Sequence, residues 1–482
     1  MSATEPCDLS ARDARRLIGT KKLSPVELME SCLARIDAVN PALNAVVACD
    51  REAALSAARA AETAVTAGAR LGALHGLPIA IKDNRAVRGM TTTNGSLLHK
   101  DEVAEADEPG VARLRAAGGI PFAKTNLPEF GAGANTTNRV FGPTGNPFDP
   151  SRTCGGSSGG SAVALATGMA PLATGSDYGG SLRTPAVFCG VSGFRPSLGV
   201  APAVASTAIL SPWGVNGPMG RSIEDAALLL SEQAYHDARD PFSTPLASGL
   251  GRKIRPADLA TLRIAHSEDL GAVPVSKAVR AVFAERISRL APLFGRLAPA
   301  HPDMGDVHDV FEVTRGLSFV AAFKDLVETR RDELDRNVVD NTERGLAYSL
   351  ADVARAQVGQ TGIYRRWGAF FDDWDAILLP GSSVAPFPHS QLFVEEIDGE
   401  AMPTYMRWLA LTYAPTMAFA CVAAVPCGVD ADGLPFGLQI AGPPGADARI
   451  LAIAHALEAA MADDPVTARP RPDLAALAGS GR

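Results

Sequence analysis

The sequence predicts an α/β protein whose β-sheet is covered by helices on both faces. Short apolar runs, such as residues 76–82 (GLPIAIK) and 120–124 (IPFAK), are typical of buried strands. Segments of helical character lie between such runs, and this alternation is typical of a sheet packed between helices. The composition is that of a globular chain with a large core, because 46% of the 482 residues are hydrophobic and 20% are charged.

The N-terminal region, residues 1–68, is expected to be helical. The segment Ser24-Pro25-Val26-Glu27 is a capping box with proline in the first helical position, so a helix is predicted to begin there. Asn40-Pro41 is expected to end this helix, because the residue before a proline disfavours the helical conformation. Residues 51–67 are rich in alanine, with Glu and Arg, which favours a second helix.

Residues 69–235 carry the clearest alternation of strands and helices. Between them, residues 131–161 are rich in Gly, Asn, Thr and Pro, and a loop of this length inside a compact fold is usually functional. The predicted strands are 76–82, 120–124 and 171–175, and the predicted helices lie near 109–117, 162–170 and 222–233.

The C-terminal half is predicted to begin with a linker and to end with strands. Residues 238–258 are rich in Asp, Pro, Ser and Gly, as linkers are, and residues 275–375 are expected to be mostly helical. Residues 376–482 are expected to close the sheet with strands at 376–380, 421–426 and 437–441 and a last helix at 446–462. Four aromatic residues near the end of the helical stretch are interpreted as anchors of a helix to the core: Trp367, Phe370, Phe371 and Trp374.

Charge and cysteine usage exclude several classes of protein. The formal net charge is −8 and no run of Lys or Arg is present, which argues against nucleic-acid binding but not against a small anionic substrate held by one arginine. The seven cysteines are scattered without a C-x-x-C pair, so no disulfide framework is expected. No H-E-x-x-H motif or paired-cysteine cluster offers a metal site, and neither a metal nor an organic cofactor is expected. No signal-peptide core or membrane-spanning run is found, so the expected location is the cytoplasm.

Two glycine-flanked serine segments carry the chemical signal. Cys154-Gly-Gly-Ser-Ser-Gly-Gly-Ser161 contains Ser157 and Ser158, and Gly179-Gly180 directly precedes Ser181. A pair of glycines before a serine can present consecutive backbone N–H groups to one point, as an oxyanion hole requires. Residues 155–159 also match the G-x-S-x-G elbow of α/β-hydrolases, but that motif needs a histidine base, and the sequence has none between His99 and His236.

The sequence resembles the amidase signature family, most densely from about residue 74 to 220. The resemblance is carried by GGSSGGSAVALATGMAPLATGSDYGGSLRTPAVFCGVSGFRP, by GLPIAIKDN and by NPFDPSR. It implies that Lys82 is the base, that Ser157 follows a cis peptide bond and relays protons, and that Ser181 is the nucleophile. The oxyanion hole implied by the resemblance consists of the backbone N–H groups of Tyr178, Gly179, Gly180 and Ser181. Tyr178 departs from the family pattern, which often has threonine there, and its side chain is expected to narrow the pocket or to bond locally.

These residue types suit acyl transfer. A serine hydroxyl becomes a good nucleophile only when a base removes its proton, and a lysine is a base only when neutral. Lys82 ends an apolar run, and burial there is expected to lower its pKa. Asp177 and Arg183, which flank the nucleophile, are interpreted as a buried ion pair that braces the loop, and Asp83 is interpreted as a residue that orients a loop.

The resemblance implies a mixed sheet in a single domain spanning residues 1–482 and a hydrolase of amides, anilides, carbamates or esters. The expected partner is a small-molecule amide, with neither nucleic acid nor membrane involved, and a homodimer is left open. Two alternatives are kept: the glutamine-amidase subunit of a tRNA-dependent amidotransferase, and a binding protein without catalytic activity on the same fold.

Overall fold

The computed structural model describes residues 5–205 and 208–480. Its strands are β1 (Val46–Cys49), β2 (Pro78–Lys82), β3 (Ile120–Thr125), β4 (Leu172–Asp177), β5 (Ser192–Arg195), β6 (Val215–Gly220), β7 (Arg263–His266), β8 (Arg296–Pro299), β9 (Ala376–Pro380), β10 (Glu396–Ile397), β11 (Glu400–Ala401), β12 (Cys421–Val429) and β13 (Pro435–Gly442). Its α-helices are α1 (Ala11–Gly19), α2 (Pro25–Leu43), α3 (Arg51–Thr66), α4 (Pro109–Ala116), α5 (Gly159–Ala166), α6 (Arg183–Phe188), α7 (Ile223–Gln233), α8 (Lys277–Leu290), α9 (Val307–Arg330), α10 (Arg336–Ala347), α11 (Leu350–Phe370), α12 (Ala410–Met417), α13 (Asp447–Met461) and α14 (Leu474–Ser480).

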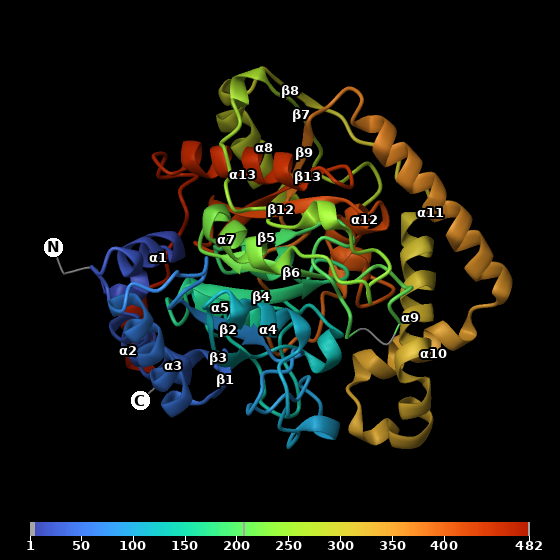
Figure 1. The fold of residues 1–482 in the computed structure, drawn as a ribbon. Helices are drawn as coiled ribbons and strands as arrows, with labels where there is room; N and C mark the ends of the chain where they lie inside the picture. The colour runs from blue at the N-terminus through green and yellow to red at the C-terminus, as the bar shows by residue number, and fades with distance from the viewer. Residues whose placement is uncertain (1–4, 206–207, 481–482) are drawn as a thin grey trace.

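Eleven of the described strands form one mixed sheet through the middle of the molecule (Figure 1). Their order is β1-β3-β2-β4-β6-β5-β12-β13-β9-β7-β8. Strand β2 runs parallel to β3 and β4, and β7 runs parallel to β8 and β9, whereas the remaining pairs are antiparallel. The α/β class and the mixed sheet are therefore confirmed.

Helices cover both faces of this sheet, as predicted. On β6, Leu182 at the start of α6 lies against Gly217, and Asp225 of α7 lies against Gly220. Because successive side chains along a strand alternate between faces, positions 217 and 220 face opposite sides. Helices α6 and α7 therefore lie on opposite faces of the sheet.

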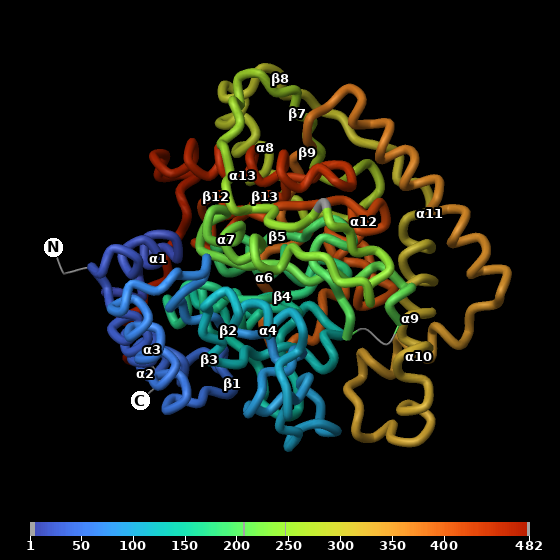
Figure 2. Tube along the Cα trace, in the orientation of Figure 1, coloured from blue at the N-terminus to red at the C-terminus, as the bar shows by residue number. Residues whose placement is uncertain are grey.

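The N-terminal helices form a group at one end of the sheet, and the C-terminus returns to it. Figure 2 shows both chain ends beside α1, α2 and α3, and α14 packs against α2. At the opposite side of Figure 1, α9, α10 and α11 extend beyond the sheet, and α10 and α11 both pack against α9. The stretch 275–375, expected to be mostly helical, thus contains α8 to α11, together with the strand β8.

The prediction that Asn40-Pro41 ends the helix that begins after Ser24 is wrong by three residues. Helix α2 continues through Pro41 to Leu43 and stops where Asn44 adopts the left-handed conformation, with φ of 54°. A proline so near the end removes few helical hydrogen bonds. The Asn40 side chain also accepts from the N–H groups of Ala45 (2.8 Å) and Val46 (2.9 Å), which stabilises the exit from the helix.

The aromatic cluster at the end of α11 anchors that helix to the core, as interpreted from the sequence. Trp367 is fully buried, and its Nε1 donates to the carbonyl oxygen of Gly442 at 3.2 Å. Trp374 is also buried, and Phe370 and Phe371 pack edge to face beside it.

In the described part of the chain, no helix has the length and apolar character needed to cross a bilayer.

Trp367→Ala should therefore destabilise the protein by about 3–5 kcal/mol, because it empties a large buried site. Val358, on the exposed side of the same helix, provides a matched control, and Val358→Ala should change the free energy of unfolding by less than about 0.5 kcal/mol. Chemical denaturation of the two variants checks this. Equal stability of both variants would contradict the anchoring role of Trp367.

Candidate active site

Lys82 ends strand β2 fully buried, and its Nζ lies among three serine hydroxyls. The distances are 2.7 Å to Ser157 Oγ, 3.0 Å to Ser158 Oγ and 3.0 Å to Ser176 Oγ. Burial, with a smaller contribution from the positive charge of Arg85, holds the pKa of Lys82 well below its ordinary value. The expected burial of Lys82 and its contact with Ser157 are both present.

Ser157 and Ser158 occupy the turn that leads into α5. The peptide bond between Gly156 and Ser157 is cis, as the resemblance implies. Ser157 Oγ is bound by Lys82, and the backbone N–H of Ser158 donates to the carbonyl oxygen of Ser181 at 3.2 Å. The two glycine-flanked serine segments, separate in the sequence, therefore lie against each other.

Ser181 lies in the turn between β4 and α6, held by the carboxylate of Asp177. Asp177 Oδ1 accepts from the N–H of Gly180 at 2.9 Å, and Oδ2 accepts from the N–H of Leu182 at 3.1 Å. The two residues on either side of the nucleophile candidate are thus bonded to one carboxylate. Ser181 is half-buried, and within the described residues its hydroxyl makes no hydrogen bond.

The ion pair expected between Asp177 and Arg183 is present and fully buried. Arg183 Nη2 lies 2.8 Å from Asp177 Oδ1 and Nε lies 3.0 Å from Oδ2, and Arg195 adds a third contact from Nη1 to Oδ1 at 3.1 Å. Burial alone would raise the pKa of Asp177, but Arg183 and Arg195 hold it well below its usual value. The carboxylate is therefore ionised and fully hydrogen-bonded.

The four backbone N–H groups assigned to the oxyanion hole differ in their availability. The N–H of Gly180 already donates to Asp177, as described above. In the part of the chain that the structure describes, no hydrogen bond engages the N–H groups of Tyr178, Gly179 and Ser181. Gly180 has a φ of 121°, and a Cβ there would lie 2.3 Å from Thr412 Oγ1, so this position requires glycine.

The side chain of Tyr178 bonds locally to helix α9. Its hydroxyl lies 3.1 Å from Ser318 Oγ and donates to the carbonyl oxygen of Thr314 at 3.4 Å. Its ring meets Phe311 edge to face, with centroids 6.0 Å apart. The departure from threonine thus ties the loop before Ser181 to a helix from the 275–375 region.

Asp83 orients a loop, as interpreted from the sequence. Its Oδ1 pairs with Lys124 Nζ at 2.9 Å, and both side chains are fully buried. Its Oδ2 accepts from the N–H of Thr93 at 3.1 Å. Both oxygens of Asp83 are therefore used in structural contacts.

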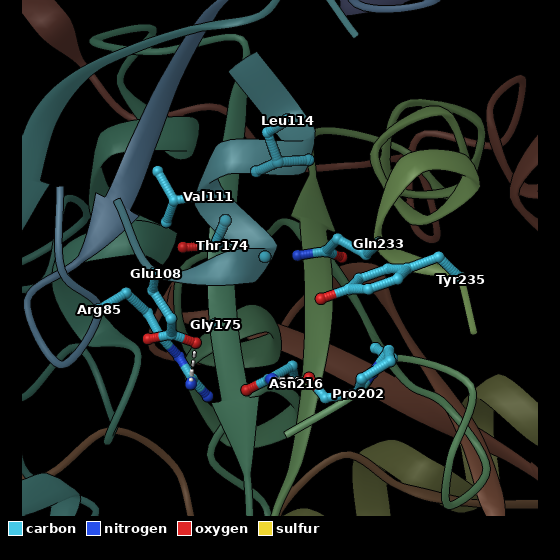
Figure 3. A pocket seen from close by; sticks show the side chains of 12 residues that line it. Arg85, Glu108, Val111, Leu114, Thr174, Gly175, Pro202, Asn216, Gln233 and Tyr235 are labelled. Atoms are coloured by element: carbon cyan, nitrogen blue, oxygen red, sulfur yellow. Dashed lines mark hydrogen bonds and ion pairs between the residues drawn. The ribbon is translucent and has the colours of Figure 1, made fainter. Parts of the chain in front are cut away.

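A small pocket lies beside strand β4, on the side of α4 and α7 (Figure 3). It measures about 30 Å³, which is room for one or two water molecules. Asn216 Oδ1, Gln233 Oε1 and the Tyr235 hydroxyl have no partner among the described residues, and the Arg85–Glu108 ion pair closes one side at 2.6 Å. Its described lining does not include Lys82, Ser157 or Ser181.

One group of potential metal ligands lies far along the chain from these serines. Among the described residues, Glu5, Cys7 and Asp8 bring their ligand atoms within 4.8 Å of one another. Arg35 pairs with both carboxylates, at 2.9 Å to Glu5 and 3.1 Å to Asp8. These donors are thus already bound to a cationic side chain.

Sequence reasoning missed two residues of this site. Ser176 contacts Lys82 from the end of β4. Thr174, two residues earlier on the same face of this strand, accepts from the backbone N–H of Lys82 at 3.1 Å, so the alternation of side chains along the strand could have indicated Ser176. Arg195, which shares Asp177 with Arg183, is 14 residues from the nucleophile candidate, and no local pattern marks it.

Comparison with known proteins matches nearly the whole chain. A family model described as "Amidase" matches residues 27–451. The "Acylamidase" of Rhodococcus erythropolis is 35% identical over 94% of this chain and 95% of its own length. A glutamyl-tRNA(Gln) amidotransferase subunit of Acidothermus cellulolyticus is 34% identical over 94% of each chain. A crystal structure of a bacterial aryl acylamidase superposes with a TM-score of 0.86 at 26% identity, covering 95% of this chain and 96% of that one.

The buried ion pair beneath the Ser181 turn yields a stability prediction. Arg183→Met should destabilise the protein by about 3–5 kcal/mol, because it removes one partner of a buried pair. The exposed pair of Arg330 with Glu333 provides the control, since Glu333→Gln should cost less than about 0.5 kcal/mol. Chemical denaturation measures both. A loss below about 1 kcal/mol for Arg183→Met would contradict the bracing role.

Proposed function

This chain belongs to the amidase signature family and is a hydrolase of amide C–N bonds, and we propose that it works through an acyl-enzyme on Ser181. The observation that supports this best is the position of Lys82. Its Nζ is fully buried and lies 2.7 Å from Ser157 Oγ, in a loop that is bonded to Ser181. A buried lysine with a lowered pKa and hydroxyl partners is the base that such chemistry requires.

The hydrogen bonds around Lys82 suit a neutral amine. A neutral amine donates two hydrogen bonds and accepts one, whereas an ammonium only donates. The Ser158 hydroxyl can donate to the carbonyl oxygen of Ser176, 3.4 Å away, and can therefore accept from Lys82. The Ser157 hydroxyl has no second partner among the described residues, so its proton is available to Nζ.

The proton then moves through Ser157. As the Ser181 oxygen attacks the carbonyl carbon of the amide, its proton passes to Ser157 Oγ and the Ser157 proton passes to Lys82 Nζ. When the C–N bond breaks, the same path returns a proton to the leaving amine and an ester remains on Ser181. Water repeats the sequence, so that acid and free enzyme are formed.

The oxyanion that forms during attack needs hydrogen-bond donors. We assign this role to the N–H groups of Tyr178, Gly179 and Ser181, because they have no other partner in the described structure. The N–H of Gly180 serves instead to hold the turn through Asp177. Preorganised donors of this kind typically contribute about 10²–10³ in rate each.

The proposed substrates are acyl amides and anilides of small molecules. The similarity to an acylamidase and to an aryl acylamidase structure supports this class. Lys82, Ser157 and Ser181 all belong to this one chain, which also supports activity without a partner chain.

A second candidate is the glutamine-amidase subunit of a tRNA-dependent amidotransferase. It is favoured by relatives of that name at similar identity and coverage. Hydrolysis of a simple anilide by the purified chain separates the two functions. Turnover of glutamine that appears only after the partner chains of an amidotransferase are added would favour the second.

The nucleophile can be identified by variants and by a covalent probe. Ser181→Ala should abolish labelling by a fluorophosphonate and lower kcat/KM by about 10⁵ or more, with the fold intact, because the attacking atom is lost. Ser157→Ala should lose about 10³ or more, because the relay is broken. Ser158→Ala is the matched control and should lose less, about tenfold, since the Ser158 hydroxyl bonds Lys82 and the Ser176 backbone but takes no part in the proposed proton path.

Mass spectrometry of the labelled peptide locates the adduct. An adduct on Ser157 or Ser158, together with an active Ser181→Ala variant, would overturn the mechanism. Absence of any adduct would favour a protein without catalytic activity.

The pH profile should report on Lys82. Because only the neutral amine accepts a proton, kcat/KM should rise as the pH passes through the lowered pKa of Lys82 and then reach a plateau. The acid limb should therefore lie well below about 10.4, the ordinary pKa of lysine. His308→Gln is the control, since His308 bonds Tyr413 near the site, and it should leave the limb in place. A limb abolished by this variant would contradict Lys82 as the base.

A further inference from the structure

Arg315, on helix α9, is a buried cation without a carboxylate partner. Only 5% of its surface is exposed, and among the described residues it forms no ion pair. Its Nε donates to Asn341 Oδ1 at 2.9 Å and its Nη2 donates to the Tyr405 hydroxyl. Neither partner carries a negative charge at neutral pH, and no hydrogen bond to a described residue engages Nη1. Burying a charge is costly unless it is paired and hydrogen-bonded, and no carboxylate of the described residues neutralises this guanidinium.

Aromatic rings surround the guanidinium of Arg315. Its carbon lies 4.5 Å from the ring centroid of Phe319, 5.3 Å from that of Tyr178 and 5.5 Å from that of Tyr405. Rings stabilise the cation through their faces but do not accept its in-plane hydrogen bonds, so Nη1 has no hydrogen-bond partner among the described residues. The group is therefore held rigidly, with donor capacity to spare.

Arg315 opens into a pocket with an excess of positive charge. The pocket measures about 140 Å³, enough for a carboxylate on a few carbon atoms. Of its acidic lining residues, Glu312 pairs with Arg407 at 2.9 Å and Asp340 pairs with Arg336 at 3.2 Å. The other two charged residues of the lining are cations, the buried Arg315 and the exposed Arg344. Arg344, like Arg315, forms no ion pair among the described residues.

This pocket adjoins the turn that carries the nucleophile. Met406 lines it, and the Met406 methyl group lies 3.1 Å from the position that a Cβ of Gly179 would occupy. The Tyr178 ring, directly before that glycine, lies against Arg315. A group bound at Arg315 therefore lies beside residues 178–179, next to the proposed oxyanion hole.

We propose that Arg315 binds a carboxylate carried by the amide substrate, an inference that rests on the proposed function and specifies its substrate class. The planar guanidinium can meet a carboxylate through its free donors, and Asn341 and Tyr405 hold it in place. The carboxylate can belong to the acyl group or to the leaving amine. A carboxylate in either part would bind Arg315 in the same way. Substrates that carry the carboxylate in only one part distinguish the two possibilities.

Two pairs of anilides test this in the intact enzyme. The acyl pair is N-phenylsuccinamic acid against N-phenylbutanamide, and the amine pair is 4-acetamidobenzoate against acetanilide. In one pair, the charged member should have kcat/KM about 10- to 100-fold above the neutral member, as expected for charge-assisted hydrogen bonds. The pair that shows the preference identifies the part of the substrate that carries the carboxylate.

Variants assign the preference to Arg315. Arg315→Met should bring the ratio of charged to neutral kcat/KM close to one, and Arg315→Lys should retain part of it, because the charge remains but the planar donors are lost. Arg286→Met is the matched control, since Arg286 is another buried arginine but lies on α8 and bonds the carbonyl oxygens of Cys427 and Val429. It should keep the wild-type ratio.

The outcomes separate this inference from the proposed function. If the wild type hydrolyses the neutral anilides and shows no preference in either pair, the carboxylate site is overturned and the amidase mechanism stands. A preference that survives Arg315→Met in folded protein also overturns it. If no anilide is hydrolysed and Ser181 is not labelled by fluorophosphonate, the proposed function fails and this inference fails with it. If Arg315→Met does not fold, the absence of a wild-type preference still overturns the site, and a reduced preference in Arg315→Lys still supports it.

Discussion

The site depends on one buried carboxylate, that of Asp177. It accepts hydrogen bonds from the N–H groups of Gly180 and Leu182 and pairs with Arg183 and Arg195. Desolvation of three charges is costly, and only this complete set of bonds offsets it. Arg183 also donates to the carbonyl oxygen of Thr412 at 2.5 Å and to Gln439 Oε1 at 3.0 Å. The turn that presents Ser181 is thereby bonded to α6, β5, α12 and β13 at once.

The pKa of Lys82 is also affected by Asp177, which opposes the lowering caused by burial. The negative charge of Asp177 tends to raise the pKa of Lys82, while burial and the charge of Arg85 lower it. Burial is the largest of these influences, so it prevails over Asp177 and the pKa of the amine falls. Asp177 therefore holds the turn that carries Ser181, while the lowered pKa of Lys82 comes from burial and from Arg85.

Much of the fold could be predicted from local patterns, and its remaining strands could not. The apolar run that ends in Lys82 and the capping box at Ser24 mark β2 and the start of α2 correctly. Strands β5 (SGFR) and β6 (VNGPMG) carry glycine and proline, which disfavour strands locally. They become strands because pairing with β4 and β12 satisfies their backbone groups. The continuation of α2 past Pro41 has a similar cause, since Asn40 and Asn44 complete its end.

By itself, the sequence determined the α/β class and the family resemblance, because these depend on residue types at characteristic spacings, and the resemblance in turn singled out Lys82, Ser157 and Ser181 as candidates for the site. Only the tertiary structure decided that Ser176 completes the surroundings of Lys82, that Asp177 occupies the N–H of Gly180, and that Arg315 lies unpaired beside Tyr178. The physical reason is that hydrogen bonding and charge pairing act over a few ångströms in space. Arg315 is 134 positions from Ser181 in the chain, so no local pattern could connect them.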